Sequence, residues 1–375
     1  MSDLSTALAG VKLSNPLVLA SGVRGNNAQL LIRAAKEGAA AVTSKSCSLQ
    51  PREGHANPTA ITAPTYMLNA IGLSNPGVEA EIDEIEEAVK GAGVPVIASV
   101  FAGSIEDFAN VAARIAIAKP AMIELDISCP NVHREGEMFS SSAEGAAGVT
   151  KAVKAKVKNI PISVKLAPNV PDIGRIAAAC RAAGADCITA INTMPAMYID
   201  VRARRAVLAN QYGGLSGPAL LPIALRCVHS VRRACPSIPI IGGGGVTSGE
   251  DAAAMLMAGA NAVSVGSAVW YRQNAFGEIK QELASFMKEE GYRKLSDIKP
   301  YENNPRLNDD AVDAVAASIR EFSFRVPIVV DAEGVIVAGH TRYKAAQKLG
   351  LDKVPVHVAK DLTPEEINRL REIIE

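Results

Sequence analysis

Short apolar segments rich in β-branched residues recur along the first three quarters of the chain, and most of them precede an alanine-rich stretch with helical spacing. One such stretch places Ile173, Ile176, Ala177 and Cys180 at i, i+3, i+4 and i+7, which is one face of a helix. Nearly continuous apolar strands that alternate with helices are typical of a parallel sheet covered by helices. The pattern predicts eight strands, at residues 16–20, 40–45, 95–101, 122–128, 162–167, 187–192, 238–242 and 262–266.

The number of strand–helix units favours one α/β fold over another. Eight units are what a closed (β/α)8 TIM barrel requires, whereas a doubly wound open sheet is the alternative. A barrel carries its functional site at the C-terminal ends of its strands. Polar residues expected at those ends include Ser21, Lys45, Asp126, Lys165 and Asn192.

The charge pattern changes near residue 296. The last 79 residues carry 11 basic and 14 acidic side chains, and the preceding 296 carry 28 and 25, so a net charge of zero conceals a difference between the two parts. We therefore expect a barrel domain at 1–296 and a small α+β domain at 297–375. The overall balance of 39 basic and 39 acidic residues argues against a protein that binds DNA through a strongly basic surface.

The six cysteines stand at 47, 129, 180, 187, 227 and 235, and no two of them are spaced CxxC. This spacing argues against a zinc ribbon or a local iron–sulfur motif and is typical of reduced intracellular thiols. Since no apolar run reaches membrane-spanning length, we expect a cytoplasmic protein. Cys180, Cys187, Cys227 and Cys235 fall in helix or strand patterns and are expected to pack in the core, whereas the role of Cys47 stays open.

Two glycine-rich turns follow the last two predicted strands, at Gly242–Gly245 and at Gly266-Ser267. Glycines let backbone amides approach an anion closely, and barrels commonly bind phosphate at this position. We favour a phosphate site over two plain turns.

Three further positions carry candidate chemistry. Lys45 and Lys165 each end an apolar strand, where they would bring positive charge to the barrel mouth. Cys129 precedes a proline in a loop and is equally consistent with a general base and with a packed thiol. The segment from Met67 to Gly77 is rich in turn formers and is expected to be an irregular loop, in which Asn69 either contacts a ligand or lies on an ordinary surface.

Nine short motifs stand in order along residues 1–296: Ala20–Gly22, Ser44–Ser46, Asn69–Leu73, Ser128–Asn131, Val164–Asn169, Ile191–Thr193, Gly213–Pro218, Gly242–Gly245 and Val265–Ser267. Together they resemble class 1 dihydroorotate dehydrogenase, a flavin enzyme of pyrimidine biosynthesis with a (β/α)8 barrel.

The resemblance implies FMN contacts at Ala20, Ser21, Gly22, Lys45, Ser46, Asp126, Lys165, Ile191 and Gly217, with the phosphate on Gly244, Gly245, Gly266 and Ser267. It implies pyrimidine contacts at Lys45, Asn69, Ile71, Gly72, Leu73, Asp126, Asn131, Asn192 and Thr193. Cys129 would act as the general base while a hydride passes to FMN.

One position departs from the family pattern, because Asp126 stands where the family usually has Asn. An ionised Asp cannot donate a hydrogen bond to a substrate carbonyl as Asn does. An alternative is therefore a flavin-dependent reductase of another pyrimidine. A third hypothesis, from a different class, is a nucleotide-binding protein whose barrel serves only as a scaffold.

The stretch Met67–Gly77 is most similar to the class 1B branch. In that branch a separate subunit carries FAD and a 2Fe–2S cluster and passes electrons to NAD, so the resemblance implies an electron-transfer partner. A homodimer that uses fumarate is the competing arrangement.

The last part of the chain has four motifs of its own, at 298–306, 315–320, 327–331 and 335–346. On these motifs, residues 297–375 resemble the ParB N-terminal, sulfiredoxin-like fold. The resemblance implies a nucleotide phosphate site at Gly339, His340, Thr341 and Arg342. DNA binding is not expected, since the segment is net acidic and no helix-turn-helix pattern follows it. A nucleotide-sensing appendage, a vestigial domain and an engineered fusion all remain open.

Overall fold

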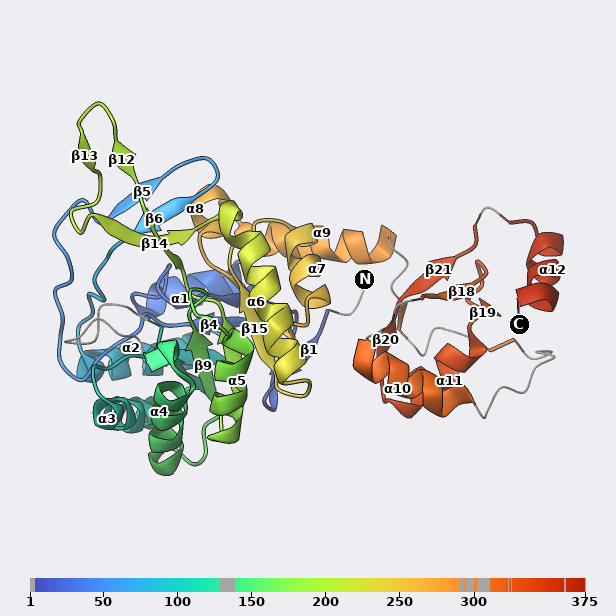
Figure 1. Cartoon of the computed structure of the whole chain (residues 1–375), viewed down its shortest axis with the longest axis horizontal. Coiled ribbons are helices and arrows are strands. Elements are labelled where there is room, and N and C mark those ends of the chain that lie inside the picture. Colours follow the sequence, from blue (N-terminus) through green and yellow to red (C-terminus); the bar gives the residue numbers. More distant parts are fainter. Residues whose placement is uncertain are drawn as a thin grey trace. The chain divides into compact units, whose positions relative to one another are not determined.

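The computed structural model describes residues 4–128, 139–289, 293–294, 300–301, 311–322, 324, 326–360 and 362–374. These residues form two compact units, one that reaches to Leu283 and one that starts at Ala284 (Figure 1). The division falls inside helix α9 (Ala275–Glu289), earlier than the boundary at 296 that the charge pattern predicts.

Eight parallel strands of the first unit close into a barrel in the order β10-β15-β16-β3-β4-β7-β8-β9. Because β16 pairs with β3, the sheet has no open edge, so the predicted barrel is confirmed and the open sheet is excluded. Most strand residues are buried, which agrees with the apolar runs in the sequence. The strands are β3 (Leu17–Leu19), β4 (Ala41–Thr43), β7 (Val96–Val100), β8 (Met122–Asp126), β9 (Ile162–Leu166), β10 (Cys187–Ala190), β15 (Ile240–Gly243) and β16 (Ala262–Val265).

Helices surround the barrel, and neighbours in sequence pack on one another (Figure 1). Several begin at a polar cap; Ser104, for example, accepts a hydrogen bond from the backbone of Asp107. The predicted apolar face of the helix after β9 is confirmed, since Ile173, Ile176 and Cys180 are all buried. The helices are α1 (Ala28–Lys36), α2 (Val78–Gly91), α3 (Ile105–Ile115), α4 (Ala143–Lys156), α5 (Ile173–Ala182), α6 (Leu221–Ala234), α7 (Gly249–Met257), α8 (Ala268–Tyr271) and α9, with 3-10 turns at Ala116–Ala118, Phe139–Ser141 and Pro218–Leu220.

A small hairpin closes the N-terminal end of the barrel. Its strands, β1 (Thr6–Leu8) and β2 (Val11–Leu13), pair antiparallel. Leu8 and Leu13 belong to the same buried cluster as Met122 and Cys187, which begin barrel strands. The apolar seal at this end leaves the C-terminal end for a ligand.

Segments inserted after β4 and β10 form an antiparallel sheet of their own. Its order is β11 (Met194–Met197), β14 (Tyr212–Ser216), β6 (Met67–Asn69) and β5 (Ala60–Thr62), and a hairpin of β12 (Ile199–Asp200) and β13 (Arg205–Ala206) extends from it (Figure 1). The expectation of an irregular loop from Met67 onward is therefore wrong at its start, because Met67–Asn69 pairs with strands on both sides. A small core around Leu68 and Leu208 holds this sheet together.

The second unit has a sheet of β19 (Ile336–Ala338), β18 (Ile328–Val330) and β21 (Val356–Val358), and a pair of β17 (Arg293–Lys294) with β20 (Lys353–Val354). Helices α10 (Val312–Phe322), α11 (His340–Lys348) and α12 (Pro364–Ile374) accompany these strands. Ile328, Ile336 and Val356 are central to its apolar core, which gives this unit a core separate from that of the barrel.

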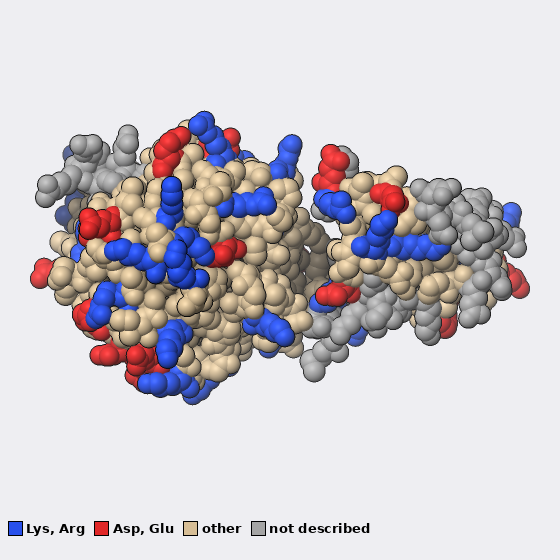
Figure 2. Space-filling view, turned by 90° about the horizontal axis from the view of Figure 1, so that it is seen from below, with Lys and Arg blue, Asp and Glu red and all other residues tan. Residues whose placement is uncertain are grey.

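The charge on one face of the surface and the length of the helices bear on what the protein could bind or span. On the face shown in Figure 2, acidic and basic side chains are mixed rather than gathered into a region of one sign. Among the described helices, none is long and apolar enough to span a bilayer.

Candidate functional site

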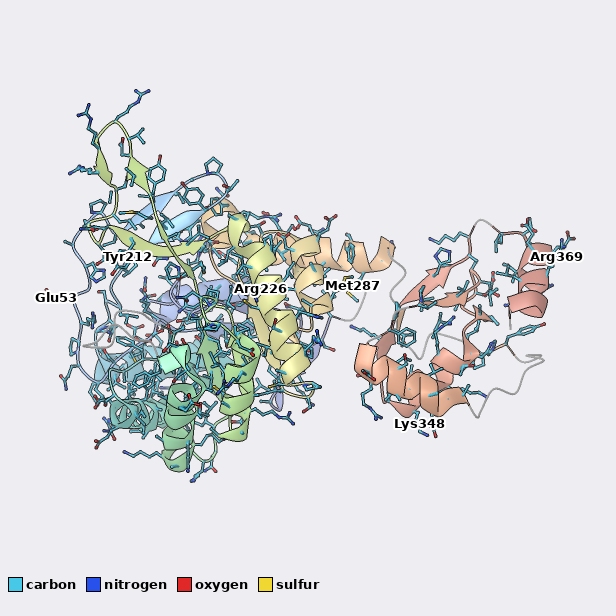
Figure 3. All side chains as sticks on the ribbon, in the orientation of Figure 1. Glu53, Tyr212, Arg226, Met287, Lys348 and Arg369 are labelled. Atoms are coloured by element: carbon cyan, nitrogen blue, oxygen red, sulfur yellow. The ribbon has the colours of Figure 1, made fainter. Side chains whose placement is uncertain are left out.

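A cavity of about 840 Å³ opens at the C-terminal end of the barrel strands, beneath the inserted sheet. Its size suits a small-molecule or cofactor site. Tyr212 on β14 lines it from the inserted sheet (Figure 3), and Trp270 on α8 also lines it although its side chain is 64% exposed. Many of the residues singled out in the sequence line this one cavity: Ala20, Ser21, Gly22, Lys45, Ser46, Asn69, Ile71, Gly72, Leu73, Asp126, Lys165, Ile191, Asn192, Thr193, Gly244, Gly245, Gly266 and Ser267.

Three predicted site residues are not among the described lining. Cys129 and Asn131 lie outside the residues that the structure describes. Gly217 is described but does not line the cavity. Its φ of 91° and a would-be Cβ only 3.0 Å from the Cα of Tyr66 explain a glycine there without any ligand.

The glycines of the two turns serve different needs. Gly244 and Gly245 have positive φ, and a Cβ on Gly245 would lie 2.5 Å from the backbone nitrogen of Leu221, so packing against α6 already requires glycine. Gly266 has ordinary φ, and a Cβ there would meet nothing closer than Ala20 at 3.4 Å. Protein packing does not demand glycine at 266, and a methyl group there would take up space beside the cavity. The shape of this wall therefore fits a ligand that approaches the backbone.

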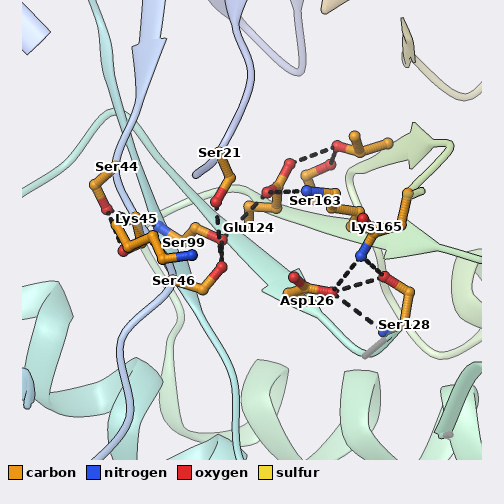
Figure 4. A network of polar contacts seen from close by, with 12 residues as sticks. Ser21, Ser44, Lys45, Ser46, Ser99, Glu124, Asp126, Ser128, Ser163 and Lys165 are labelled. Atoms are coloured by element: carbon orange, nitrogen blue, oxygen red, sulfur yellow. Dashed lines mark hydrogen bonds and ion pairs between the residues drawn. The ribbon is translucent and has the colours of Figure 1, made fainter. Parts of the chain in front are cut away.

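A chain of hydroxyl groups runs across one side of the cavity (Figure 4). The Oγ atoms of Ser21 and Ser46 are 3.1 Å apart, and those of Ser46 and Ser99 are 2.9 Å apart. Ser99 then donates to Oε1 of Glu124 at 3.2 Å. The strand ends β3, β4, β7 and β8 are thus joined through side chains as well as through the sheet.

Glu124 is the main site residue that the sequence reasoning missed. It lies on β8 and lines the cavity although it is only 3% exposed. Its Oε2 accepts a hydrogen bond from Thr189 at 3.0 Å, and its Oε1 lies 3.7 Å from Nζ of Lys165. The signal was present in the sequence, because Glu124 stands two residues before Asp126 and alternate residues of a strand share a face.

Asp126 is the centre of a second polar cluster (Figure 4). Its Oδ1 accepts hydrogen bonds from the hydroxyl of Ser128 at 2.7 Å and from the amide of Asn192 at 3.2 Å. Asn192 also donates to Ser128 at 2.6 Å. The cluster fixes the side chains of the loop ends after β8 and β10, and it presents a carboxylate to the cavity.

The described cysteines are all buried. Burial raises the pKa of Cys180 and of Cys187 to about 12, and it also raises the pKa of Cys47. A thiol with such a pKa carries almost no thiolate at neutral pH. Cys47, whose role the sequence left open, is buried and is not among the residues that line the cavity.

In the second unit, the predicted phosphate-binding turn leads into α11. Gly339 has a φ of 111°, and a Cβ there would lie 2.8 Å from the guanidinium of Arg342, so glycine leaves room for that side chain. His340 is buried, and its Nε2 accepts a hydrogen bond from the backbone N–H of Tyr301 at 3.0 Å. The histidine thus ties the turn to a distant segment, and the phosphate site stays a prediction.

Comparison with known proteins finds two family models along this chain. The dihydroorotate dehydrogenase model matches residues 3–287, and the ParB N-terminal domain model matches residues 281–371. The two matches overlap within α9.

Three relatives, each named dihydroorotate dehydrogenase B (NAD(+)) catalytic subunit, show the extent of the similarity. The protein of Methanosarcina mazei is 46% identical over 299 residues, which is 80% of this chain and 94% of the relative. That of Pyrococcus abyssi is 42% identical over 79% of this chain and 97% of the relative. That of Methanocaldococcus jannaschii is 44% identical over 76% and 94%.

Proposed function

The chain belongs to the dihydroorotate dehydrogenase family, and we propose that it is an FMN-dependent enzyme that oxidises dihydroorotate to orotate in pyrimidine biosynthesis. One observation carries the proposal: a single cavity at the C-terminal end of the barrel brings together both glycine turns with the predicted residues Lys45, Lys165, Asn69, Asn192 and Asp126. A barrel that served only as a scaffold would not need these polar residues to line one cavity.

FMN would be held at the C-terminal ends of β16 and β3, the neighbouring strands whose pairing closes the barrel. The turn at Gly266 and Ser267 leaves open space beside Ala20, and Gly22 leaves space near the ammonium of Lys45. Bound FMN would supply an acceptor for a hydride from the substrate carbon. Lys45 and Lys165 bring positive charge to the cavity, where it favours a reduced, electron-rich ring.

The substrate would lie between the cofactor and the inserted sheet. Asn69 at the end of β6 and Asn192 after β10 reach the same cavity from different elements. Their amide groups can donate and accept hydrogen bonds at the edge of a pyrimidine. Asp126 offers an acceptor for a ring N–H. The inserted sheet covers the barrel mouth and limits the access of water.

We assign the removal of the ring proton to Cys129, which lies outside the described residues. The assignment rests on the resemblance of Ser128–Asn131 to the family motif. Loss of a general base costs on the order of 10² to 10⁴ in rate. Cys129→Ala should therefore lose at least a hundredfold in kcat, whereas Cys227→Ala, on the buried face of α6, should keep its activity.

The experiment that tests the proposal has two steps. The purified protein is first examined for bound flavin by its visible spectrum, and then for orotate formation from dihydroorotate with an artificial electron acceptor. A protein that takes up no FMN, or that binds FMN but forms no orotate, refutes the proposed activity. If FMN is bound and another dihydropyrimidine is oxidised instead, that dihydropyrimidine replaces dihydroorotate as the proposed substrate. Asp126 is then the first residue to substitute in a test of substrate choice.

The natural electron acceptor is a separate proposal. The relatives are named catalytic subunits of an NAD(+) enzyme. These names support a separate partner subunit. From the resemblance of Met67–Gly77 to the class 1B branch, we propose that this partner carries FAD and a 2Fe–2S cluster, and we further propose that it binds a homodimer of this chain in the cytoplasm. Copurification of the native protein, followed by assay with NAD and with fumarate, separates the two arrangements. Activity with fumarate in the absence of any partner would overturn the partner proposal.

For the second unit we propose nucleotide binding at Gly339–Arg342. The match to the ParB N-terminal domain and the glycine turn before α11 support it. Binding of CTP or ATP to the full chain, lost in Arg342→Ala but kept in Arg369→Ala, would support the site. No binding by the wild type would leave this unit with a structural role.

A further inference from the structure

Glu124 places a carboxylate inside the barrel, where an apolar side chain is usual. The residue is 3% exposed, and two hydroxyl groups and one ammonium surround its oxygen atoms. Burying a charge costs free energy even when partners are present. A position at the floor of the cofactor cavity offers a functional reason for this cost.

The carboxylate fixes the direction of the hydroxyl groups around it. An ionised carboxylate only accepts hydrogen bonds, so Ser99 must donate to Glu124. Each hydroxyl has a single hydrogen, and Ser46 must therefore donate to Ser99, and Ser21 to Ser46. Ser21 is left with its lone pairs for the cavity, so Glu124 determines which groups this wall can offer to a ligand.

The same argument holds on the other side of the barrel. Thr189 donates to Glu124, so Ser163, whose Oγ lies 2.8 Å from Oγ1 of Thr189, must donate to Thr189. The hydroxyl dipoles of both branches point toward a single acceptor.

Lys165 is the second group that Glu124 controls. The distance of 3.7 Å between Nζ and Oε1 is long for a hydrogen bond but short for attraction between charges. Both side chains are largely shielded from solvent, so their attraction is screened weakly. A ligand in the cavity therefore experiences the positive charge of Lys165 partly offset by the nearby negative charge of Glu124.

We propose that Glu124 is a positioning residue that lowers the reduction potential of the flavin bound in this cavity. It does so by balancing the charge of Lys165 and by orienting the hydroxyl chain. The inference rests on the proposed binding of FMN, but it does not depend on which pyrimidine is oxidised.

The test compares variants that remove the charge with one that keeps it. Glu124→Gln preserves the shape of the side chain, and Glu124→Ala is a second neutral variant that leaves room for water beside Lys165. Glu124→Asp keeps the charge and serves as the matched control. The midpoint potential of bound FMN is measured in each purified protein by reductive titration against a reference dye, which requires no substrate.

We expect the neutral variants to have a midpoint potential at least about 30 mV above that of the wild type, a tenfold change in the two-electron equilibrium. Glu124→Asp should stay closer to the wild type than either neutral variant. A folded, FMN-bound neutral variant with an unchanged or lower potential would overturn the inference. A wild type that binds no FMN would instead refute the proposed function, so the two failures are distinguishable.

Discussion

Glu81 on α2 allows a prediction about stability that can be worked out from the structure. The residue is 2% exposed, and its Oε2 has no hydrogen-bond partner among the described residues. Burial raises the pKa of its carboxyl group from 4.5 to about 7, although a hydrogen bond with Ser44 and the charge of Lys45 oppose the shift. The folded protein therefore keeps a proton on Glu81 over a pH range in which the unfolded chain has lost it.

The sign and size of the effect follow from this difference. Below pH 4.5 both states hold the proton, so the stabilising contribution of protonated Glu81 is fully present. It is lost as the pH rises toward about 7, where the folded state also ionises. At about 1.36 kcal/mol per pKa unit, the loss is about 3 kcal/mol. Glu81→Gln cannot ionise, and it should escape this loss.

The assay is urea unfolding of wild type and Glu81→Gln at pH 4.5 and pH 8, followed by circular dichroism. The variant should gain about 3 kcal/mol relative to the wild type between the two pH values. Glu86→Gln, at a more exposed position on the same helix, is the control and should show little change. If the difference between Glu81→Gln and wild type is the same at both pH values, the reasoning is refuted.

Three other substitutions have expected outcomes. Gly266→Ala should weaken FMN binding at least tenfold while the melting temperature of the apoprotein stays unchanged, since its Cβ meets the cavity rather than the protein; unchanged affinity by fluorescence titration would contradict this. Asp126→Asn should lower the KM for dihydroorotate, because it removes a negative charge from the site of an anionic substrate while its amide oxygen can still accept the ring N–H; a raised KM in steady-state assays would contradict this. Arg371→Ala should destabilise the second unit by about 3 kcal/mol, since Arg371 pairs with Asp331 at 2.8 Å and stacks on Tyr301. Hydrogen exchange of the β18 amides in the full chain measures this loss of stability, and unaltered protection of those amides would contradict the prediction.

The barrel could be predicted from the sequence because a parallel strand that is buried on both faces gives a run of consecutive apolar or small residues. Residues such as Val96–Val100 must all be apolar or small when helices cover one side and the barrel interior the other. All eight predicted strands are present. The position of a polar residue at a strand end then suffices to place it at the mouth, as for Lys45 and Asp126.

Other parts of the site depend on long-range pairing and were not predictable in this way. Met67–Asn69 became a strand because β14, far along the chain, pairs with it. The sequence places Glu124 on the same strand face as Asp126, but it gives no sign of the hydroxyl groups that surround the buried carboxylate. Those partners come from β7 and β10, and only the closed barrel brings them together.

The hairpin β1–β2 has a consequence for enzyme kinetics. Because Leu8 and Leu13 seal the N-terminal end of the barrel, the described residues leave the opposite mouth as the way for a small molecule into the cavity. Substrate and product of the proposed reaction must then use the same entrance. Bound orotate blocks the binding of dihydroorotate, so orotate should be a competitive inhibitor with respect to dihydroorotate. The rate of product release through this entrance sets an upper limit on turnover.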